Sequence, residues 1–562
     1  MTIRLRNLRT GWSTRKPLLD GGLDPVPVPA EVGDTLELFT TDSSGVSSRH
    51  LAAVTLGRPP VIVRTVPPPK KTDVPLNAIM VAIFSEPIDG QTLSHQTMQL
   101  LLGGQPVDGA VSLTPDGLIA SFAPSSSLVA QTAYTLVVTT DVADPSGAHL
   151  EAAAVVPFVT APATGFPQAS RLPMISAGFS HTCAVAETGD AYCWGSNSFG
   201  ELGIGHTSPF ESSPQRVTGG LKFLSVSAGA GYTCGVVTGG DAYCWGENEF
   251  GELGTGDTSG RVVPTPVLGQ FGIATLSAGM GTTCAITNGG HEYCWGNGSV
   301  GQLGRLDTQD NWFSTIPVLA DTGPLISTSA TGLVHTCALD GSSRVFCWGA
   351  TTYHVAALAR DVWIMASSAS PQPLLEQLAF KSVATGLFHS CGIATSGAAY
   401  CWGTNSAGQL GNGLLGDSLT STGLVPAPVV GGFTFDQIAP SEGEFSCGIV
   451  TGGAAYCWGI NDWGQLGSPL TMEGCPAVPQ DVVPYARSTI PGTAIPCSKV
   501  PVHAVASVTF ASLSAGTVHA CGISVTGLAY CWGGNADGQL GDGSTTSTAQ
   551  PVLVPIVLSS LP

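Results

Sequence analysis

Sixteen cysteines are the residues of this chain with the clearest chemical potential, because thiolates bind metal ions, attack substrates or oxidise to disulfides. Fourteen of them form seven pairs in which nine residues separate the two cysteines and Trp-Gly follows the second. The pairs are Cys183 with Cys193, Cys234 with Cys244, Cys284 with Cys294, Cys337 with Cys347, Cys391 with Cys401, Cys447 with Cys457 and Cys521 with Cys531. What the two sulfurs of a pair do therefore decides what chemistry the chain can perform.

The spacing of each pair favours a disulfide over a zinc site. The C-x-x-C spacing of zinc sites is absent, and two thiolates across one hairpin would supply half of the usual four ligands. Cys183 and Cys193 are symmetric about Thr188, which predicts two strands joined by a three-residue loop with Gly189 in the left-handed conformation. The cysteines would then oppose each other at a non-hydrogen-bonded position with Cα atoms ~4.5 Å apart, a separation that a disulfide spans. We expect seven stapled hairpins and no metal.

The two remaining cysteines lie in an insertion. Successive first cysteines are 51, 50, 53, 54, 56 and 74 residues apart, so the insertion falls in the last interval, at about 468–502. By elimination Cys475 pairs with Cys497 and fixes a protruding loop. Loops longer than ~15 residues without structure of their own are often functional, so this loop is a candidate binding element. The alternative is a tolerated surface insertion.

Histidines stand two residues before the first cysteine in four repeats, at His181, His335, His389 and His519. The same position holds Tyr232, Thr282 and Phe445 in the other repeats, which favours a packing and hydrogen-bonding role over a metal-binding ring. The chain has no G-x-S-x-G, H-E-x-x-H or phosphate-loop motif. We therefore expect no enzyme, no cofactor and no catalytic residue, although a dispersed active site leaves no such motif.

The hairpins must be positioned by larger sheets. Side chains alternate along a strand, so Tyr192 and Trp194 would lie on the face opposite the cysteines, and both faces of each hairpin are apolar. Radial packing of the sheets covers both faces, and seven repeats of this length predict a seven-bladed β-propeller over residues 165–562. We expect residues 550–561 to pair with residues 171–176 and so close the ring. The structural tryptophans of the repeats are Trp194, Trp245, Trp295, Trp348, Trp402, Trp458 and Trp532.

The residues before the repeats also predict strands. Only 10% of residues are charged, whereas the chain has 73 glycines and 40 prolines, a composition that favours short strands and tight turns. Residues 61–161 alternate strand patterns with turn signals, as a β-sandwich does. Residues 1–60 read as a partial, possibly truncated β-domain or linker, with strands in residues 25–56. The chain would then begin inside a longer protein.

The repeat unit resembles a known propeller family. It reads G-x-x-H-T-C-A-V, a turn, then Y-C-W-G-x-N-x-x-G-x-L-G-x-G, as in residues 194–203, 409–411 and 539–541, and is similar to the regulator of chromosome condensation repeats. Repeat four departs, because the G-x-L-G loop is missing after Trp348 and Gly349. The cysteines depart from the eukaryotic pattern and suggest an exported bacterial branch. Residues 61–161 resemble bacterial immunoglobulin-like (Ig-like) domains, which implies a spacer in an exported protein.

Charge and cysteine usage limit the classes of partner and the compartment that we expect for this chain. The 20 basic and 39 acidic residues give a net charge of -19, which argues against nucleic acid as a partner. No apolar run approaches the ~20 residues of a membrane span. The first 16 residues are basic but lack the apolar core of a secretory signal, whereas fully paired cysteines indicate an oxidising compartment. We expect a secreted or cell-surface protein whose export signal lies upstream.

The leading functional hypothesis is a non-catalytic extracellular protein with a monomeric propeller whose rim loops bind a protein or another cell-surface macromolecule. The resemblance implies two alternatives. The first is guanine-nucleotide exchange on a small GTPase, as in the family's founding member. The second is inhibition of a cell-wall enzyme or β-lactamase, since a bacterial inhibitor of this kind has the same fold.

Overall fold

The computed structural model describes residues 2–9, 13–17, 35–41, 47–53, 59–67, 69–70, 74, 78, 80–113, 117–126, 128–160, 174–269, 272–305, 313–355, 362–374, 378–415, 425–468, 473–475, 495–505, 507–556 and 558. Every regular element within these residues is a β-strand, and the strands form ten antiparallel sheets. No helix long and apolar enough to cross a membrane occurs among the described residues. The predicted all-β fold is confirmed.

The first sheet has four strands in the order β2-β1-β3-β4. Its strands are β1 (Thr2–Asn7), β2 (Ser13–Pro17), β3 (Thr35–Thr41) and β4 (Ser47–Ala53). The sequence pattern predicts strands only in residues 25–56. The strands β1 and β2 do not follow from it because their alternation is carried by basic residues, as in Thr-Ile-Arg-Leu-Arg-Asn.

A β-sandwich follows, with the sheets β5-β6-β10-β9 and β12-β11-β7-β8. Its strands are β5 (Ile62–Val66), β6 (Met80–Phe84), β7 (Met98–Leu102), β8 (Gln105–Pro106), β9 (Gly109–Leu113), β10 (Ile119–Pro124), β11 (Ala133–Val138) and β12 (Ala154–Val159). In β11 buried and more exposed side chains alternate, as expected for a strand with one face on the core. Phe122, Tyr134 and Phe158 are buried in a single apolar core between the sheets.

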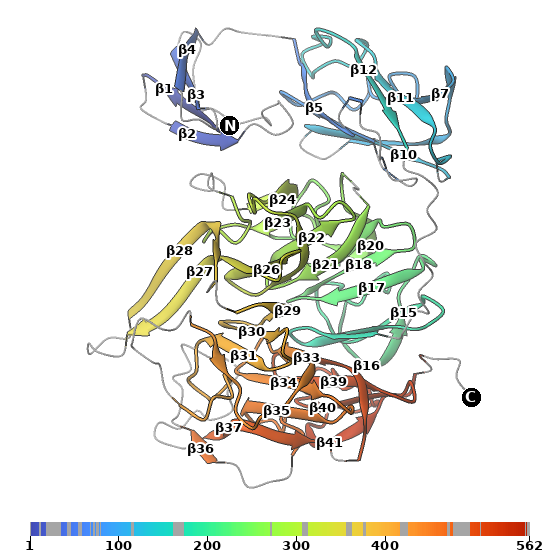
Figure 1. The fold of residues 1–562 in the computed structure, drawn as a ribbon. Coiled ribbons are helices and arrows are strands. Elements are labelled where there is room, and N and C mark those ends of the chain that lie inside the picture. The colour runs from blue at the N-terminus through green and yellow to red at the C-terminus, as the bar shows by residue number, and fades with distance from the viewer. Residues whose placement is uncertain are drawn as a thin grey trace.

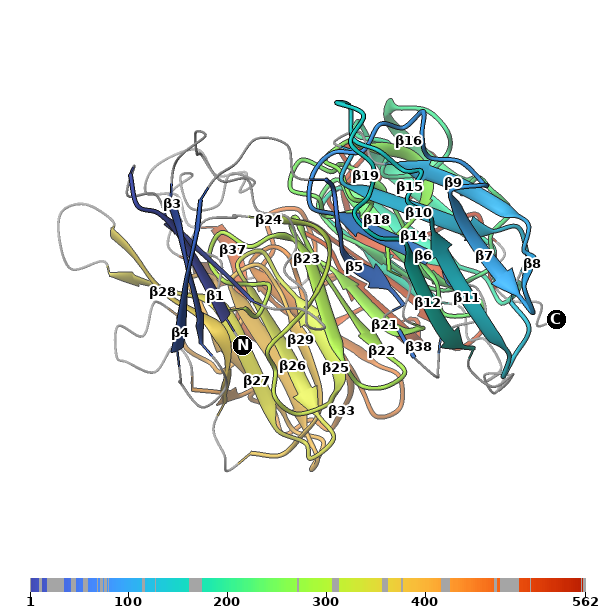
Figure 2. The same ribbon diagram turned by 90° about the horizontal axis from the view of Figure 1, so that it is seen from above.

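Seven further sheets form the propeller, one for each repeat (Figures 1 and 2). Blade 1 comprises β13 (Met174–Ala177), β14 (His181–Val185), β15 (Ala191–Asn197) and β16 (Ser208–Arg216). Blade 2 comprises β17 (Phe223–Ala228), β18 (Tyr232–Val237), β19 (Ala242–Gly246) and β20 (Arg261–Pro266). Blade 3 comprises β21 (Ile273–Ala278), β22 (Thr282–Thr287), β23 (Glu292–Asn297) and β24 (Phe313–Leu319). Blade 4 comprises β25 (Ile326–Thr331), β26 (His335–Asp340), β27 (Val345–Val355) and β28 (Val362–Pro373).

The last three blades have the same plan. Blade 5 comprises β29 (Phe380–Thr385), β30 (His389–Ala394), β31 (Ala399–Gly403) and β32 (Ala427–Pro428). Blade 6 comprises β33 (Phe435–Pro440), β34 (Phe445–Val450), β35 (Ala455–Ile460), β36 (Glu473–Cys475) and β37 (Ile495–Ala504). Blade 7 comprises β38 (Phe510–Ala515), β39 (His519–Ser524), β40 (Ala529–Gly533) and β41 (Thr548–Leu553).

The first strands of the seven blades contact one another in a closed ring, from β13 through β38 and back to β13. Serine side chains reinforce this ring: Ser176 Oγ accepts a hydrogen bond from the Ala228 amide, and Ser514 Oγ accepts one from the Ala177 amide. The second of these bonds joins blade 7 to blade 1. The ring therefore closes through contacts of the same type as those between blades 1 and 2.

The predicted closure by strand exchange is wrong. The C-terminal strand β41 pairs with β40 of its own blade, and β13 pairs with β14. The tail beyond β41 still reaches blade 1, because the Glu187 amide donates to the Leu558 carbonyl and Val554 and Leu558 pack beside Trp194. Repeat one already supplies all four strands of its blade, which leaves no vacant strand position for the tail.

Two blades depart from the common plan. In blade 4, β27 and β28 form a long hairpin that projects from the ring, in the position where other repeats have the G-x-L-G loop (Figure 1). In blade 6, the insertion adds β36 as a fifth strand beside β37. The part of the predicted binding loop between residues 476 and 494 lies outside the described residues.

The sandwich rests against the propeller. Val81, Ile83 and Ile119, from its sheet β5-β6-β10-β9, form an apolar cluster with Leu268 and Ile316 of blades 2 and 3 (Figure 1). These residues point away from the core of the sandwich and lose contact with water through this second packing surface. The two domains thus share a direct apolar contact in addition to the connecting chain.

Candidate functional site

The structure joins every predicted cysteine pair in a disulfide. The staples of blades 1 to 7 bond Cys183 to Cys193, Cys234 to Cys244, Cys284 to Cys294, Cys337 to Cys347, Cys391 to Cys401, Cys447 to Cys457 and Cys521 to Cys531. The eighth disulfide joins Cys475 to Cys497 in the insertion of blade 6.

The geometry of the staples agrees with the spacing of the cysteines. In blade 1 the pair is directly opposed in the register of β14 and β15, with Cα atoms 4.1 Å apart. Ala186 and Asp190 close a three-residue loop in which Gly189 has φ +79°. In blade 4 the loop ends in Ser343 instead, which also takes a positive φ, of 66°. Each staple therefore lies between the paired strands of its hairpin, with two residue pairs between it and the pair that closes the loop, as the spacing predicts.

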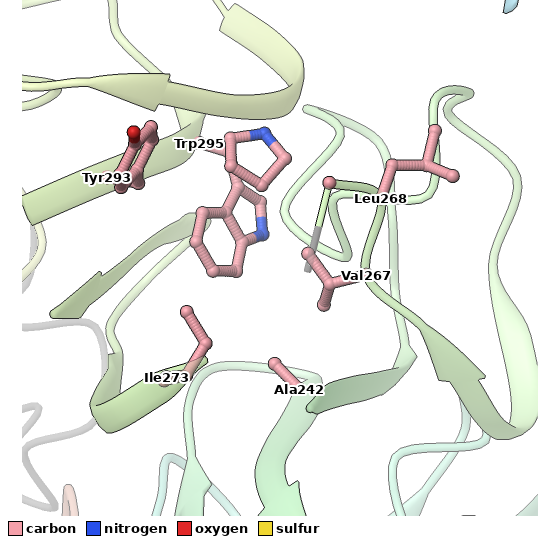
Figure 3. Close-up of a pocket in the computed structure, with 8 residues that line it drawn as sticks. Ala242, Val267, Leu268, Ile273, Tyr293 and Trp295 are labelled. Atoms are coloured by element: carbon pink, nitrogen blue, oxygen red, sulfur yellow. The ribbon is translucent and has the colours of Figure 1, made fainter. Parts of the chain in front are cut away.

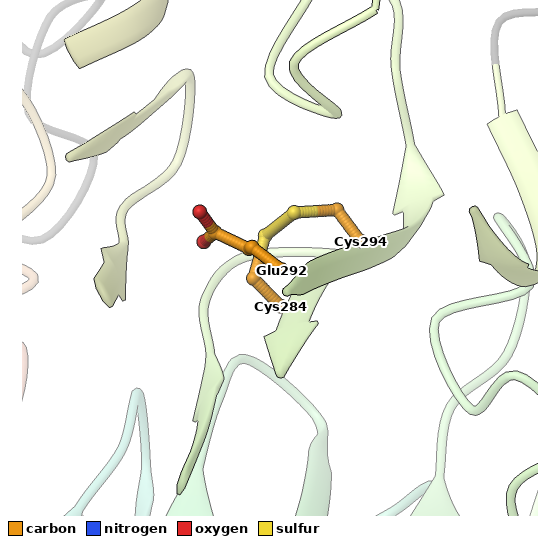
Figure 4. Close-up of side chains that lie close together, drawn as sticks. All are labelled: Cys284, Glu292 and Cys294. Atoms are coloured by element: carbon orange, nitrogen blue, oxygen red, sulfur yellow. A yellow bond between two sulfur atoms is a disulfide. The ribbon is translucent and has the colours of Figure 1, made fainter. Parts of the chain in front are cut away.

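One cluster has the composition of a metal site, namely Cys284, Glu292 and Cys294 of blade 3 (Figure 4). Its two sulfurs are bonded to each other, so neither is a thiolate able to bind a metal ion. Burial raises the pKa of Glu292 to about 8, and the neutral carboxyl group is the dominant form at pH 7. The cluster is a buried staple beside a protonated acid.

The repeat tryptophans join neighbouring blades. We call the eight residues after each Trp-Gly the junction loop; these loops are residues 196–203, 247–254, 297–304, 404–411, 460–467 and 534–541. Within the described residues, the indole Nε1 of six repeat tryptophans donates to a backbone carbonyl of the preceding blade's junction loop, for example Trp245 to Glu201 at 2.9 Å and Trp194 to Gln539 at 2.9 Å. The same bond is made by Trp295, Trp348, Trp458 and Trp532. Repeat four has no junction loop, and no such bond to Trp402 occurs within the described residues.

The four predicted histidines lie at these junctions as well. Each Nε2 lies within hydrogen-bond distance of a hydroxyl group of the next blade: His181 of Thr233, His335 of Ser390, His389 of Ser446 and His519 of Thr182. Burial lowers the pKa of His181 and His389 to about 3, so both rings are neutral at pH 7. The geometry gives the histidines the hydrogen-bonding role expected from the sequence.

A small apolar crevice opens between blades 2 and 3 (Figure 3). It is lined by Ala242, Val267, Leu268, Ile273, Tyr293 and Trp295, and holds no more than about one water molecule. Its lining side chains are the packing residues of the junction, next to the Leu268 contact with the sandwich. The crevice has neither the volume nor the polar groups of a substrate site.

The junction loops differ in one residue that the fold does not require. The residue before Leu-Gly is Glu201 in blade 1 and Glu252 in blade 2, and it is glutamine in the other four loops. In every loop its side-chain oxygen accepts the amide hydrogen two residues earlier, at 2.8 Å for Glu201 and 2.9 Å for Gln409. A neutral amide makes this bond as well. Glu201 also accepts a hydrogen bond from Ser196 Oγ at 2.6 Å, and burial raises the pKa of both carboxyl groups, that of Glu252 to about 7.

Two exposed phenylalanines accompany these carboxylates. Phe199 is 50% exposed and Phe250 is 38% exposed, at matching positions of the first two junction loops. A Cβ atom placed on Gly231 would lie 3.2 Å from Phe199 Cδ2 and 2.7 Å from Glu247 Oε2, so the ring and the carboxylate cover the same glycine. We call the surface formed by Phe199, Glu247, Glu249 and Phe250 the acidic aromatic surface; Glu201 and Glu252 themselves are buried, each only 1% exposed.

Comparison with known proteins identifies the repeats. The regulator of chromosome condensation (RCC1) repeat is matched in two family models, at residues 175–201, 223–252, 380–409 and 510–539 and at residues 239–286 and 526–562. The matched residues lie in blades 1, 2, 3, 5 and 7 of the propeller, which therefore contains RCC1 repeats. Residues 57–160 match the bacterial Ig-like domain, which overlaps the sandwich. The family resemblance of both parts is thereby confirmed.

Curated relatives of the RCC1 repeats have several different functions. The ultraviolet-B receptor UVR8 of Arabidopsis thaliana is 28% identical over 68% of this chain and 69% of the receptor. The secretion-regulating guanine nucleotide exchange factor of Bos taurus is 27% identical over 66% of this chain and 80% of the factor. The probable E3 ubiquitin-protein ligase HERC4 of Rattus norvegicus is 32% identical over 17% of this chain, but the match spans only 9% of the ligase.

Solved RCC1 propellers share the fold. Prp20p of Saccharomyces cerevisiae superimposes with a TM-score of 0.52 at 21% identity, covering 65% of this chain and 86% of Prp20p. Human WBSCR16 gives a TM-score of 0.52 at 18% identity, covering 65% of this chain and 94% of WBSCR16. Together with the seven sheets, these likenesses confirm the seven-bladed RCC1-type propeller.

The sequence pattern predicts the scaffold residues of the RCC1 repeats but not the acidic aromatic surface. Because every junction loop shares its glycines, the pattern indicates turn geometry alone. Aligning the six loops would have revealed Glu201 and Glu252 as the exceptions to a glutamine column, with phenylalanine two residues earlier in both cases.

Proposed function

We propose that the protein is a non-catalytic, extracellular binding protein whose junction-loop face contacts another protein. The observation that carries this proposal is the pair of exposed phenylalanines, Phe199 and Phe250, on loops whose other recurring residues are occupied by the fold. Exposed aromatic side chains on rigid loops are typical anchors of protein interfaces, because they bury a large area at a small entropic cost.

The disulfides support an extracellular site of action. All sixteen cysteines are bonded, and disulfides persist mainly in oxidising compartments. They also make the binding loops rigid, since each junction loop starts three residues after a stapled cysteine. A rigid loop loses little entropy on binding, which favours affinity.

The relatives support binding as the general role of the fold. The structure of Prp20p was described together with its binding to Gsp1p and histones, and another structure shows yeast RCC1 (Prp20) bound to Kap60. Guanine-nucleotide exchange is suggested by a relative named for that activity, which is 27% identical over 66% of this chain. Inhibition of a cell-wall enzyme or β-lactamase would be one form of the proposed protein binding.

Site-specific photo-crosslinking tests the proposed face. A photoreactive phenylalanine analogue replaces Phe199 or Phe250, and a matched control carries it at Val155, which is 63% exposed on the sandwich. We expect the Phe199 and Phe250 positions to crosslink the same extracellular protein and the Val155 position not to. Crosslinks only at Val155, or none from the two loop positions, would contradict the proposed face.

A further inference from the structure

The buried carboxyl group of Glu292 stands at a repeat position that otherwise holds a small apolar residue. Five of the other six repeats have alanine there, as at Ala242 and Ala399, and repeat four has Val345. The side chain of Glu292 is fully buried, and neither carboxyl oxygen makes a hydrogen bond within the described residues. A buried carboxyl group without such a bond costs stability, so the fold does not account for its presence.

Glu292 lies at the junction between blades 3 and 4, beside the staple of blade 3 (Figure 4). It precedes Cys294 by two residues in β23, so its side chain points to the same face as the staple. A carboxyl oxygen of Glu292 lies within 4.8 Å of both sulfurs. Ile286, its Cα partner in β22, packs against Ile326 and Trp348 of blade 4. One face of this hairpin thus holds the carboxyl group, the disulfide and the apolar contact to blade 4.

The staples face the following blade. In blades 1, 2, 4, 5 and 7 the sulfur of the first cysteine lies 3.7 to 4.0 Å from a hydroxyl group of the next blade, for example Cys391 Sγ from Ser446 Oγ. Cys284 and Cys294 are 0% exposed, so a thiol reagent reaches their sulfurs through transient opening of the junction between blades 3 and 4. The free energy of that opening therefore controls how fast this staple reacts.

The buried carboxyl group makes this junction easier to open as the pH rises. Burial raises the pKa of Glu292 to about 8, and the Ser329 hydroxyl of β25, which lies near it without hydrogen-bond geometry, lowers that pKa in part. Opening the junction hydrates the carboxyl group and returns its pKa toward the ordinary value of 4.5. Between pH 4.5 and pH 8, opening therefore releases a proton. The equilibrium constant for opening rises in this range by up to about tenfold per pH unit, and it is constant below pH 4.5.

No neighbouring charge offsets this effect. The acidic, basic and histidine side chains on or next to the strands that face Glu292 are His291, Arg305, Asp321, His335, Asp340 and Arg344. Burial lowers the pKa of His335 to about 4, so its ring is neutral over most of this pH range. Asp340 pairs with Arg344 at 2.8 Å. None of the six groups contributes to the pKa shift of Glu292, which has burial and the Ser329 hydroxyl as its causes.

We propose that the staple between Cys284 and Cys294 is the redox-reactive disulfide of the propeller, opened by an external dithiol through the junction that Glu292 weakens. One thiolate of the dithiol attacks a sulfur of the staple, the S–S bond breaks, and a mixed disulfide and a free cysteine form. The second thiolate attacks the mixed disulfide, which frees the other cysteine and leaves the dithiol as a cyclic disulfide. Each freed cysteine takes up one of the two protons that the dithiol loses. Two electrons thus pass to the staple, and blade 3 loses its crosslink independently of the proposed binding face.

Partial reduction of the full chain tests the inference. Dithiothreitol is added below the amount of disulfide, free thiols are trapped with N-ethylmaleimide at timed intervals, and peptide mapping by mass spectrometry gives the reduction rate of each staple. At pH 7 we expect Cys284 and Cys294 to be labelled at least tenfold faster than the cysteines of the other six staples. The reagent's own ionisation cancels in this ratio, which should rise between pH 6 and pH 8. A ratio near one, or a ratio that does not change with pH, overturns the inference.

Two variants separate the ionisation of Glu292 from the mere burial of a polar group. Glu292→Ala installs the residue that five other repeats use, and it should slow the labelling of Cys284 and Cys294 at least tenfold at pH 7. Glu292→Gln keeps a buried polar group that does not ionise, so the ratio should lose its rise with pH. The control, Glu249→Ala, removes an exposed acid of the neighbouring blade and should change all rates less than twofold. An unchanged rate in Glu292→Ala, or a rise with pH that persists in Glu292→Gln, contradicts the proposal.

Discussion

The sandwich encloses one apolar core, in which Phe122, Tyr134 and Phe158 pack between two sheets, whereas the propeller divides its apolar side chains among the junctions between blades. No cysteine occurs before residue 183, and every blade of the propeller has a disulfide. Junctions of the propeller also bury polar groups, such as His389 and Ser446, that must be paired. The propeller, with its small separate cores, is therefore stabilised by disulfides and hydrogen bonds in addition to apolar packing, whereas the sandwich is stabilised by one large apolar core without disulfides.

Reduction of the disulfides should produce the largest difference in stability between the propeller and the sandwich. Each staple closes a loop of about ten residues and is worth roughly 2 to 3 kcal/mol, so losing all of them should unfold the propeller in mild denaturant. The sandwich has no disulfide and should keep its structure. Hydrogen exchange of β18 and β39 against β6 and β11, with and without reductant, measures both responses. Equal protection of β18 and β39 in the two conditions would show that the staples are dispensable.

Truncation of a core side chain in the sandwich should destabilise the sandwich and leave the propeller folded. Phe122→Ala removes a buried ring from the sandwich and should cost about 3 to 5 kcal/mol of its stability. All repeat tryptophans lie in the propeller, so their fluorescence should keep its transition while the protection of β6 and β11 falls. Val129→Ala, at an exposed position, is the control. A matching loss of the tryptophan transition would mean that the apolar contact between Val81 and Leu268 couples the two domains.

A glycine at the closing junction should matter less than either of these changes. Gly541 has φ +70°, and an added Cβ would lie 2.6 Å from Trp194 Nε1, so Gly541→Ala should cost about 3 kcal/mol through strain and crowding. Gly413 has φ +82° with no atom within 4 Å of an added Cβ, so Gly413→Ala should cost only about 1 kcal/mol. Urea unfolding monitored by tryptophan fluorescence compares them. Equal costs would show that crowding against Trp194 does not contribute.

The buried histidines should give the propeller a pH response of their own. The pKa of His389 is about 3 in the folded chain, below its ordinary value near 6.5 in the unfolded chain. The contribution of the neutral ring to the free energy of unfolding is therefore complete above pH 6.5. It is lost as the pH falls from 6.5 toward 3, by about 1.4 kcal/mol per pH unit. His389→Gln should reduce this slope by that amount without changing it above pH 7. Urea titrations between pH 4 and 8 measure the slope, and an unchanged slope would contradict a buried neutral ring.

Much of the scaffold can be predicted from the sequence, because the propeller repeats one local rule. The symmetric spacing of Cys183 and Cys193 about a loop with Gly189 specifies a hairpin, and seven copies specify a ring. The closure of the ring was predicted wrongly. Residues 550–561 have the same apolar pattern whether they pair as a strand with blade 1 or pack their side chains against it. Contacts such as His519 with Thr182, which join residues 337 positions apart, have no local signature.

The acidic aromatic surface could be predicted less well for a different reason. Glu201 and Gln409 make the same backbone contact, so the structural role of the position masks the difference in charge. Only the superposition of blades shows that Phe199 and Phe250 are exposed at the same place. The residues of the proposed binding face depart from the repeat, and a motif search discards departures.

Each blade is a contiguous stretch of chain. Within the described residues, side-chain contacts, the tail and a backbone bond from the Gly543 amide to the Ser212 carbonyl close the seam between blades 7 and 1, and no strand is shared across it. Under tension between the domains before blade 1 and the end of blade 7, no shared strand would resist the opening of this seam. The staples limit how far each opened blade can lengthen, since residues between two bonded cysteines cannot extend. A pulled molecule would therefore release one blade at a time, each shorter than its sequence length by the residues that its disulfide encloses.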